Sequence, residues 1–340
     1  MIIDIWKQIK KGEFAQLYLL YGSESFLIHE TIQLLINHVL NEDEKDFNLS
    51  TYDLEEIPIE VALEDAETFP FLGEKRLIIL QNPVFLTSEK TKEKVEHNIS
   101  KLELYISNPP PYSIVVLAAP YEKLDERKKI TKELKRNAVM GEAKKLNDQE
   151  LRNWIKDRIS VNGVQMEEKA LDKMIAIAGT NLFVLTNEID KMSLYVGNEK
   201  KIDLQTVEKL VSKTLEQNIF ELVDKVVHRK TEDALRIYYD LLKQNEEPLK
   251  ILALLAGQFR LIYQVKELAR KGYGQQQIAS AIKQHPYRVK LAAGQASLFT
   301  DKELVEMMRL FAEADYQMKT GSLNKTMIIE MIFFKLNSLS

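Results

Sequence analysis

The first strand-to-glycine junction of this sequence is where a phosphate-binding loop would be expected. Residues 16–21 are a short apolar run that ends in Gly22, which is typical of a buried strand followed by a turn. A loop that binds nucleotide phosphates continues from its glycine with four residues and then Gly-Lys-Ser/Thr. Those last three positions hold Leu27, Ile28 and His29. Because the lysine for the phosphates and the hydroxyl for magnesium are both missing, we predict a degenerate phosphate loop that binds no nucleotide cofactor and supports no hydrolysis.

Other catalytic chemistry is equally poorly represented in the sequence. The five histidines lack the spacing of metal ligands, and the absence of cysteine excludes thiolate ligands and disulfides. No Gly-x-Ser-x-Gly nucleophile elbow occurs. The acidic run Glu42-Asp43-Glu44 is more typical of a solvated segment than of a metal site. We therefore expect no catalytic residue and no metal site.

Basic residues are concentrated between positions 123 and 145. Three of them, Lys128, Lys132 and Arg136, are candidates for contacts with DNA phosphates. A solvated helix face is the simpler interpretation, because the net charge of −4 does not by itself call for a nucleic-acid partner. Both interpretations stay open at this point.

A different kind of signal lies in residues 66–76, where large apolar side chains are set among structure breakers. Pro70 favours an extended Phe69 and removes a backbone donor, and Gly73 provides the backbone freedom of a turn. Phe71 and Leu72 lie between these two breakers. They are either loop residues that tuck into the core or an exposed apolar anchor for a partner.

The composition indicates a soluble globular protein of two or three domains. The chain has 340 residues, of which 45% are hydrophobic and 29% charged. The N-terminus lacks a signal-peptide pattern, and the most apolar run, residues 327–336, contains Glu330 and Lys335. That run is therefore predicted to be a buried helix and not a membrane span. We expect a cytoplasmic protein without a membrane partner.

Strands and helices alternate in the first part of the chain. Short β-rich runs joined by helices predict a parallel sheet with helices on both faces, in a domain of residues 1–143. The expected strands are residues 16–21, 47–52, 77–80, 113–118 and 138–142. The expected helices after the first strand are one that begins near Ser23 or Ser25, and residues 58–67, 87–106 and 125–136.

From Asn147 onward the pattern is helical, with no convincing strand. We predict a small helical domain of residues 144–213 and a longer one of residues 214–340. In the latter, Pro248 begins a helix that reaches about Arg270, and Pro286 begins another. The final helix, from Leu323, is apolar on nearly every side, so other protein must enclose it.

Several segments, in this order and spacing, resemble one family. The chain looks like the clamp-loader members of the AAA+ proteins and, more narrowly, is similar to the delta subunits of the bacterial DNA polymerase III clamp loader. The resembling segments are residues 19–24, 69–77, 218–224, 247–255, 258–260, 285–289 and 314–321. The resemblance implies an α/β N-terminal domain with an AAA+ RecA-like parallel five-stranded sheet, followed by two all-α domains, a small helical lid domain and a helical collar domain.

The resemblance also implies a function in DNA replication. Members of the family grip the ring-shaped sliding clamp (the beta subunit) and help to open it, while other subunits hydrolyse ATP. The apolar pair that enters the clamp matches Phe71 and Leu72, with Phe69 beside them and Pro70 as a local departure from relatives that lack a proline there. The implied partners are the clamp, the delta prime and tau/gamma subunits through the collar, and primer-template DNA within the complex. DNA-directed DNA polymerase (nucleotidyltransferase) activity would be associated with the chain only through the complex.

Two alternative functions remain to be weighed against this one. The first is a nucleotide-switched AAA+ ATPase, which the missing lysine of the phosphate loop disfavours. The second is a DNA-binding module that uses the basic residues 127–136.

Overall fold

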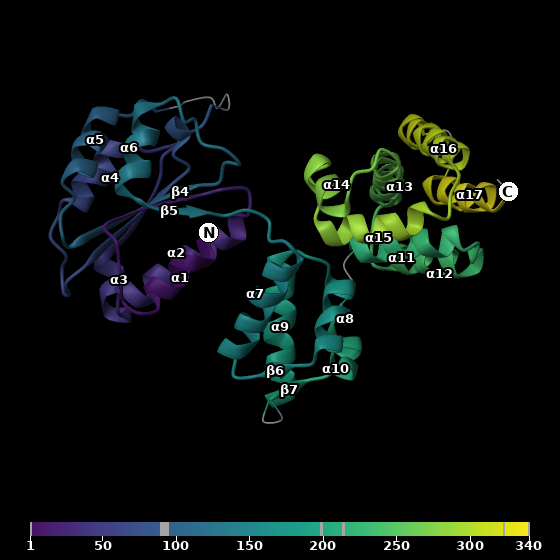
Figure 1. Ribbon diagram of the computed structural model, residues 1–340, viewed down its shortest axis with the longest axis horizontal. Helices are drawn as coiled ribbons and strands as arrows, with labels where there is room; N and C mark the ends of the chain where they lie inside the picture. The colour runs from purple at the N-terminus through teal and green to yellow at the C-terminus, as the bar shows by residue number, and fades with distance from the viewer. Residues whose placement is uncertain (1, 89–94, 198–199, 213–214, 322–323, 339–340) are drawn as a thin grey trace. The chain divides into compact units, whose positions relative to one another are not determined.

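The computed structural model describes residues 2–88, 95–197, 200–212, 215–321 and 324–338. The chain divides into two compact units, Met1–Lys145 and Leu146–Ser340 (Figure 1). The boundary between these units, after Lys145, lies two residues beyond the predicted domain boundary at 143. The predicted boundary between the two helical domains falls on residues 213 and 214, which lie outside the described residues.

The N-terminal unit is built on a five-stranded sheet in which every neighbouring pair is parallel, as predicted. The strand order is β2-β3-β4-β1-β5. In β1, Leu19 is aligned with Leu117 of β4 on one side and with Met140 of β5 on the other. The strands are β1 (Leu17–Tyr21), β2 (Leu49–Asp53), β3 (Arg76–Gln81), β4 (Ser113–Ala119) and β5 (Val139–Glu142).

Helices cover both faces of this sheet, because its strands carry apolar side chains on both faces and each face must be buried. On one face, Leu19, Ile78 and Leu117 pack in a core with α4, α5 and α6, which lie together in Figure 1. On the other, α1 packs on α2 and β5. The helices are α1 (Ile2–Ile9), α2 (Ser25–Val39), α3 (Glu42–Asn48), α4 (Ile59–Ala66), α5 (Ile99–Ser107) and α6 (Lys129–Asn137), with a 3-10 turn η1 (Val84–Leu86).

Three predicted elements of this unit begin two or more residues later than expected. The second strand starts at Leu49 and not at 47, because α3 occupies residues 42–48; its first turn is closed where the Asn41 backbone N–H donates to the Glu44 carboxylate at 2.9 Å. The prediction of a helix over 87–106 is wrong in extent: α5 begins at Ile99, while residues 89–94 lie outside the described residues. The basic helix starts at Lys129 rather than 125.

In the described residues up to 212, the second unit has four helices and one small strand pair. The expectation of no strand after Asn147 is wrong in one detail, since β6 (Gln165–Met166) and β7 (Lys201–Ile202) form a parallel pair of two residues each. The helices are α7 (Asp148–Val161), α8 (Glu168–Ala178), α9 (Leu182–Val196) and α10 (Leu204–Leu210).

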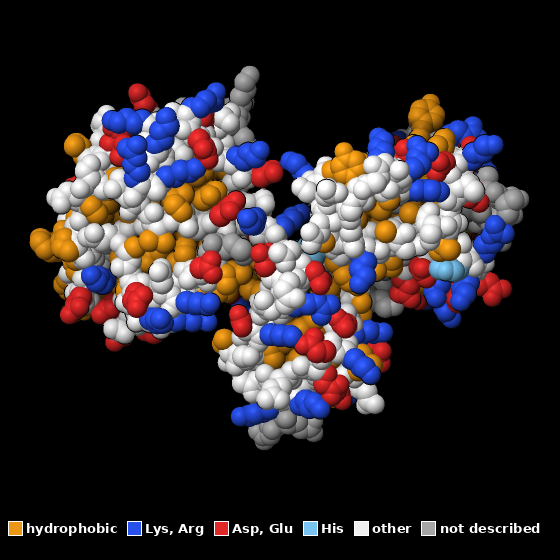
Figure 2. All heavy atoms as spheres, in the orientation of Figure 1, with side chains coloured by type: hydrophobic (Ala, Val, Ile, Leu, Met, Phe, Trp, Pro, Cys, Tyr) orange, Lys and Arg blue, Asp and Glu red, His pale blue; other side chains and the backbone are white. Residues whose placement is uncertain are grey.

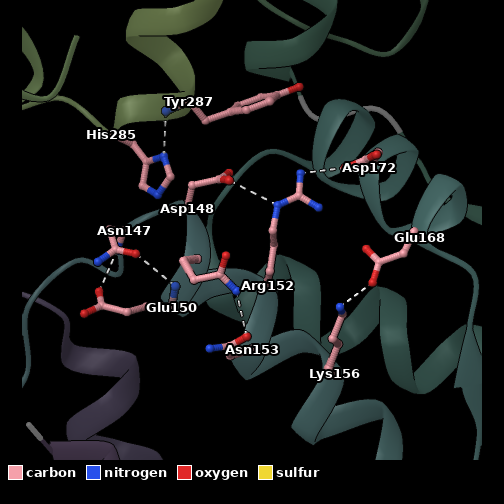
Figure 3. A network of polar contacts seen from close by, with 11 residues as sticks. Asn147, Asp148, Glu150, Arg152, Asn153, Lys156, Glu168, Asp172, His285 and Tyr287 are labelled. Carbon is pink, nitrogen blue, oxygen red and sulfur yellow. Dashed lines mark hydrogen bonds and ion pairs between the residues drawn. The ribbon is translucent and has the colours of Figure 1, made fainter. Parts of the chain in front are cut away.

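Polar contacts cap the N-terminus of α7 and join α7 to α8 (Figure 3). The predicted N-cap Asn147 accepts from the Glu150 backbone N–H at 2.9 Å, and the Glu150 carboxylate accepts from the Asn147 backbone N–H at 2.8 Å. Arg152 extends this network by donating to Asp148 at 3.1 Å and to Asp172 of α8 at 2.5 Å. The two helices are therefore joined by charge-assisted contacts.

We call the remaining helices the collar; α13 is their centre and contacts α11, α14, α15, α16 and α17. The predicted limits of α13, Pro248 and Arg270, are confirmed. Its Phe259 and Ile262 lie in a continuous apolar core that also includes Phe311 and Ile329. The collar helices are α11 (Leu215–Val227), α12 (Thr231–Lys243), α13 (Pro248–Arg270), α14 (Gln275–Ala281), α15 (Pro286–Ala296), α16 (Asp301–Thr320) and α17 (Lys325–Ser338).

Candidate protein-binding tip

The apolar segment singled out in the sequence is an exposed turn between α4 and β3. We call residues 68–75 the tip; they form neither helix nor strand. The exposed fractions are 75% for Phe69, 59% for Phe71 and 62% for Leu72. The interpretation in which these side chains tuck into the domain core is therefore wrong. The tip is an exposed apolar group on an otherwise polar turn, as the alternative interpretation predicted.

The tip backbone is fastened from within by one side chain of α3. Asn48 is fully buried. Its Nδ2 donates to the carbonyl oxygens of Phe71 at 2.7 Å and of Leu72 at 2.9 Å, and its Oδ1 accepts from the Phe71 backbone N–H at 2.7 Å. Both polar atoms of one side-chain amide therefore bind two consecutive residues of the turn.

Two further aromatic rings flank the tip. Phe47 of α3 lies beside Phe71 with ring centroids 5.2 Å apart, and Tyr112 lies beside Phe69 at 4.6 Å. The Tyr112 hydroxyl also donates to the Glu67 carbonyl at 2.7 Å, where α4 ends. Phe47 is itself half exposed, so the apolar surface extends beyond the tip onto α3.

An ion pair holds the base of the tip. Arg76, the first residue of β3, pairs with Asp65 of α4 and donates to the Phe47 carbonyl at 3.2 Å. Burial alone would raise the pKa of the Asp65 carboxyl, but hydrogen bonds from Ser50 and Arg76 outweigh it and hold that pKa below its usual value. Asp65 is therefore charged at neutral pH and joins the two elements that carry the tip.

The turn after β1 is closed by the chain that follows β5. Gly22 has a φ of +135°, and a Cβ there would lie 2.0 Å from the Ala143 carbonyl oxygen. That oxygen accepts from the Glu24 backbone N–H at 3.0 Å, so this N–H already has a partner. Burial raises the pKa of the Glu24 carboxyl, although Lys145 opposes the effect. A phosphate loop would have free N–H donors at this turn. Here Glu24 has an acidic side chain instead, and its backbone N–H is already bonded.

The three substituted positions of the loop have ordinary structural roles. Leu27 and Ile28 are buried in the N-terminal unit, whereas His29 is exposed on α2. This arrangement fits a helix that has been packed for stability, because apolar side chains at these positions cannot contact phosphate or magnesium.

The basic candidates do not form an open cationic patch. Lys128 donates inward to the carbonyls of Phe85 at 2.8 Å and Thr87 at 3.0 Å. Lys132 is exposed, and Arg136 lies 3.5 Å from Glu133. Acidic side chains pair with the neighbouring bases, and Figure 2 shows blue and red side chains interspersed on the α5–α6 side of this unit. The geometry favours a solvated, locally neutralised face.

Among the described residues, no group of three or more acidic or histidine side chains is arranged to hold a metal ion. Within the same residues, no helix combines the length and apolar character needed to cross a bilayer.

Sequence reasoning finds the tip but misses the residues that hold it. The β-rich pattern places Phe47 and Asn48 in a strand, and nothing in the sequence singles out Tyr112. The capping pattern of Asn41 and Glu44 is the signal that could have identified α3. No local pattern indicates that the Asn48 side chain reaches the tip, because that contact joins segments far apart in the sequence.

Comparisons with known proteins agree over nearly the whole chain. Residues 18–144 match the family model "DNA polymerase III, delta subunit", and residues 216–336 match "DNA polymerase III delta subunit, C-terminal domain". The DNA polymerase III subunit delta of Bacillus subtilis (strain 168) is 49% identical over 336 residues, which cover 99% of this chain and 97% of that protein. The probable DNA polymerase III subunit delta of Aquifex aeolicus (strain VF5) is 25% identical, with coverage of 76% and 72%.

A solved structure extends the match to three dimensions. The Bacillus subtilis DNA clamp loader delta protein (YqeN) has a TM-score of 0.77 at 49% identity, with 99% of this chain and 100% of that chain covered. Sequence, domain models and fold thus agree from the sheet to the collar, and the chain belongs to the delta-subunit family of the DNA polymerase III clamp loader.

Proposed function

We propose that this subunit binds the sliding clamp through the tip and helps to open it for loading onto primed DNA, without hydrolysing ATP itself. The observation that carries the proposal is the exposure of Phe71 and Leu72 on a fastened turn. Exposed aromatic and aliphatic side chains on a preorganised support are the usual anchors of protein interfaces.

Two such anchors supply enough free energy for specific binding. Full burial of a Phe or Leu side chain contributes about 1.5–3 kcal/mol each. Two anchors therefore account for roughly two or more decades of affinity. Because both side chains are already largely exposed in the free subunit, their removal costs little folding stability.

The proposal is tested by measuring clamp affinity for Phe71→Ala and Leu72→Ala variants of the full chain. Each change should weaken binding at least about tenfold while leaving the thermal unfolding midpoint nearly unchanged. Leu104→Ala is the matched control, because Leu104 lies on α5 of the same unit and is 74% exposed. Its affinity for the clamp should equal that of the unmodified chain.

Unchanged affinity in both tip variants would contradict the proposal. A loss of affinity that merely parallels a loss of thermal stability would also contradict it, since that result would assign Phe71 and Leu72 a role in folding.

Ring opening requires no bond cleavage by this subunit. A protein that binds the open clamp more tightly than the closed clamp shifts the equilibrium between them by its differential affinity. The energy that resets the cycle then comes from ATP hydrolysis in other subunits. The closed turn at Gly22 and the buried side chains of Leu27 and Ile28 support this division of labour. Equilibrium binding of ATP to the isolated subunit would count against it.

The same proposal includes assembly with the delta prime and tau/gamma subunits through the collar. Its support is the final helix α17, which buries Ile329 and Phe333 but exposes Met327, Met331 and Phe334. Primer-template DNA is then a partner of the complex, and the location is the cytoplasm, where the replication machinery works.

A further inference from the structure

We propose that Asn48 is the positioning residue of the tip: its buried carboxamide holds Phe71 and Leu72 in the conformation that binds the partner. The inference deepens the proposed clamp-binding function and rests on it. It assigns a role in binding to a polar residue whose side chain is fully buried and therefore does not touch the partner.

The three hydrogen bonds of Asn48 are all directed at the tip. The carboxamide Nδ2 bonds to two carbonyl oxygens and Oδ1 to one N–H group, at distances from 2.7 to 2.9 Å. The side chain is fully buried, so water does not compete with these bonds. A buried amide that directs all three of its bonds to one turn fixes the path of that turn.

The conformation that Asn48 holds is one that leucine does not favour. Leu72 has a φ of +53°, in the left-handed region that costs a branched residue about 1–2 kcal/mol. The next residue, Gly73, has a φ of +123°, and a Cβ there would lie 2.5 Å from Oε1 of Glu44. Strain at an exposed residue persists only where surrounding contacts enforce it.

The contacts described here with Leu72 and Gly73 come from one short helix, α3. In this helix, the Glu44 carboxylate lies close to Gly73, and the Phe47 ring lies beside Phe71. Asn48 forms hydrogen bonds with the backbone of the tip. The helix therefore acts as a support beside the tip, and Asn48 is the member that binds its backbone. Without it, Leu72 is expected to leave the left-handed region and the two anchors to sample several orientations.

Such sampling weakens binding in proportion to the lost population. If only about one tenth of molecules keep the competent conformation, the apparent dissociation constant rises about tenfold. Asn48→Ala should therefore lower clamp affinity about tenfold or more, although position 48 is buried away from the partner.

The control variant is Thr31→Ala. Thr31 is likewise fully buried in the N-terminal unit, where its Oγ1 accepts from Trp6 Nε1 and donates to the Leu27 carbonyl, both at 2.7 Å. Its loss destabilises the unit through α1 and α2, which carry no residue of the tip. Full-length Thr31→Ala should therefore unfold at a lower temperature but retain its clamp affinity below that transition.

A double-mutant cycle separates positioning from general stability. Asn48→Ala is combined with Leu72→Ala, and the clamp affinities of the single and double variants are compared. If Asn48 acts through the tip, its substitution costs less affinity once the Leu72 anchor is absent, because only Phe71 is then left for it to position. Additive losses would overturn the inference, as would equal losses of affinity in Asn48→Ala and Thr31→Ala.

The outcomes distinguish this inference from the function on which it rests. Full affinity in both Phe71→Ala and Leu72→Ala would overturn the proposed clamp-binding role, whereas full affinity in Asn48→Ala with a loss in Leu72→Ala would overturn only the role of Asn48. Amide exchange of the unmodified subunit covers the case in which Asn48→Ala fails to fold. The Phe71 amide should exchange more slowly than those of Gly73 and Glu74; equally fast exchange would overturn the inference.

Discussion

At the scale of single residues, the tip combines an exposed anchor with an unfavourable backbone. Leu72 is exposed and has a left-handed φ of +53°. A residue chosen for stability alone would be glycine or asparagine, which adopt this region at lower cost. An exposed, branched apolar side chain in this conformation is consistent with a role in binding rather than in folding.

Substitution of Leu72 by asparagine should separate stability from binding. We expect Leu72→Asn to match the unmodified chain in stability or to exceed it by up to about 1 kcal/mol, because asparagine tolerates the left-handed region. The same variant should lose clamp affinity at least about tenfold, because the anchor is gone. Denaturant titration and a clamp-binding isotherm measure the two quantities. A variant that is clearly less stable would show that Leu72 supports the fold.

At the scale of elements, the turn after β1 is defined by close packing of the chain against itself. In the structure this turn is closed by the segment that follows β5, with Gly22 against the Ala143 carbonyl. The close approach leaves no space for a side chain at position 22. The turn is therefore a structural joint between two strands of the sheet.

Gly22→Ala should be severely destabilising. The added Cβ would overlap the Ala143 oxygen at a φ of +135°, and the combined strain and overpacking cost about 3 kcal/mol or more. Gly12→Ala is the matched control, since Gly12 also has a positive φ, +77°, but a Cβ added there would meet no other atom within 4 Å. That control should cost only about 1–2 kcal/mol. Equal unfolding free energies for the two variants would contradict this packing.

Much of the architecture follows from local sequence patterns. The buried strands are continuous apolar runs, and Pro248 and Pro286 mark helix starts, so the sequence predicts these elements to within a residue or two. Pro70 and Gly73 indicate a turn between α4 and β3, but they leave open whether its apolar side chains are buried or exposed. The predicted start of β2 is wrong because Phe47 and Asn48 suit a strand in isolation but complete α3 in the folded chain. Their contacts with the tip depend on tertiary structure, which no local pattern encodes.

At the scale of the whole molecule, apolar surface is left exposed where partners are expected. The tip is one such place, and α17 is another. Met327, Met331 and Phe334 are 54%, 47% and 58% exposed, and their spacing puts them on one face of the helix. The opposite face carries Ile329 and Phe333 into the collar core. The sequence predicts that other protein encloses this helix. The chain itself covers the face with Ile329 and Phe333, and the other face is exposed.

Phe334→Asp should impair assembly of the clamp loader. A charge on the exposed face of α17 is costly to bury against another subunit, so we expect at least about tenfold weaker association with the remaining subunits. Clamp affinity of the isolated subunit should not change. Leu194→Asp, which puts the same charge at an exposed position of α9, is the control for size-exclusion analysis of the complex. Normal assembly of the Phe334→Asp subunit would exclude this face from the interface.

The most direct measurement of the central claim is a titration of the sliding clamp with residues 1–145 alone, beside the full chain and residues 146–340. The N-terminal unit has its own sheet and core, and it contains the entire tip. We expect it to bind the clamp with nearly the affinity of the full chain and to lose that affinity when Leu72 is changed to alanine. Binding by residues 146–340 instead, with none by residues 1–145, would contradict the claim that the tip grips the clamp.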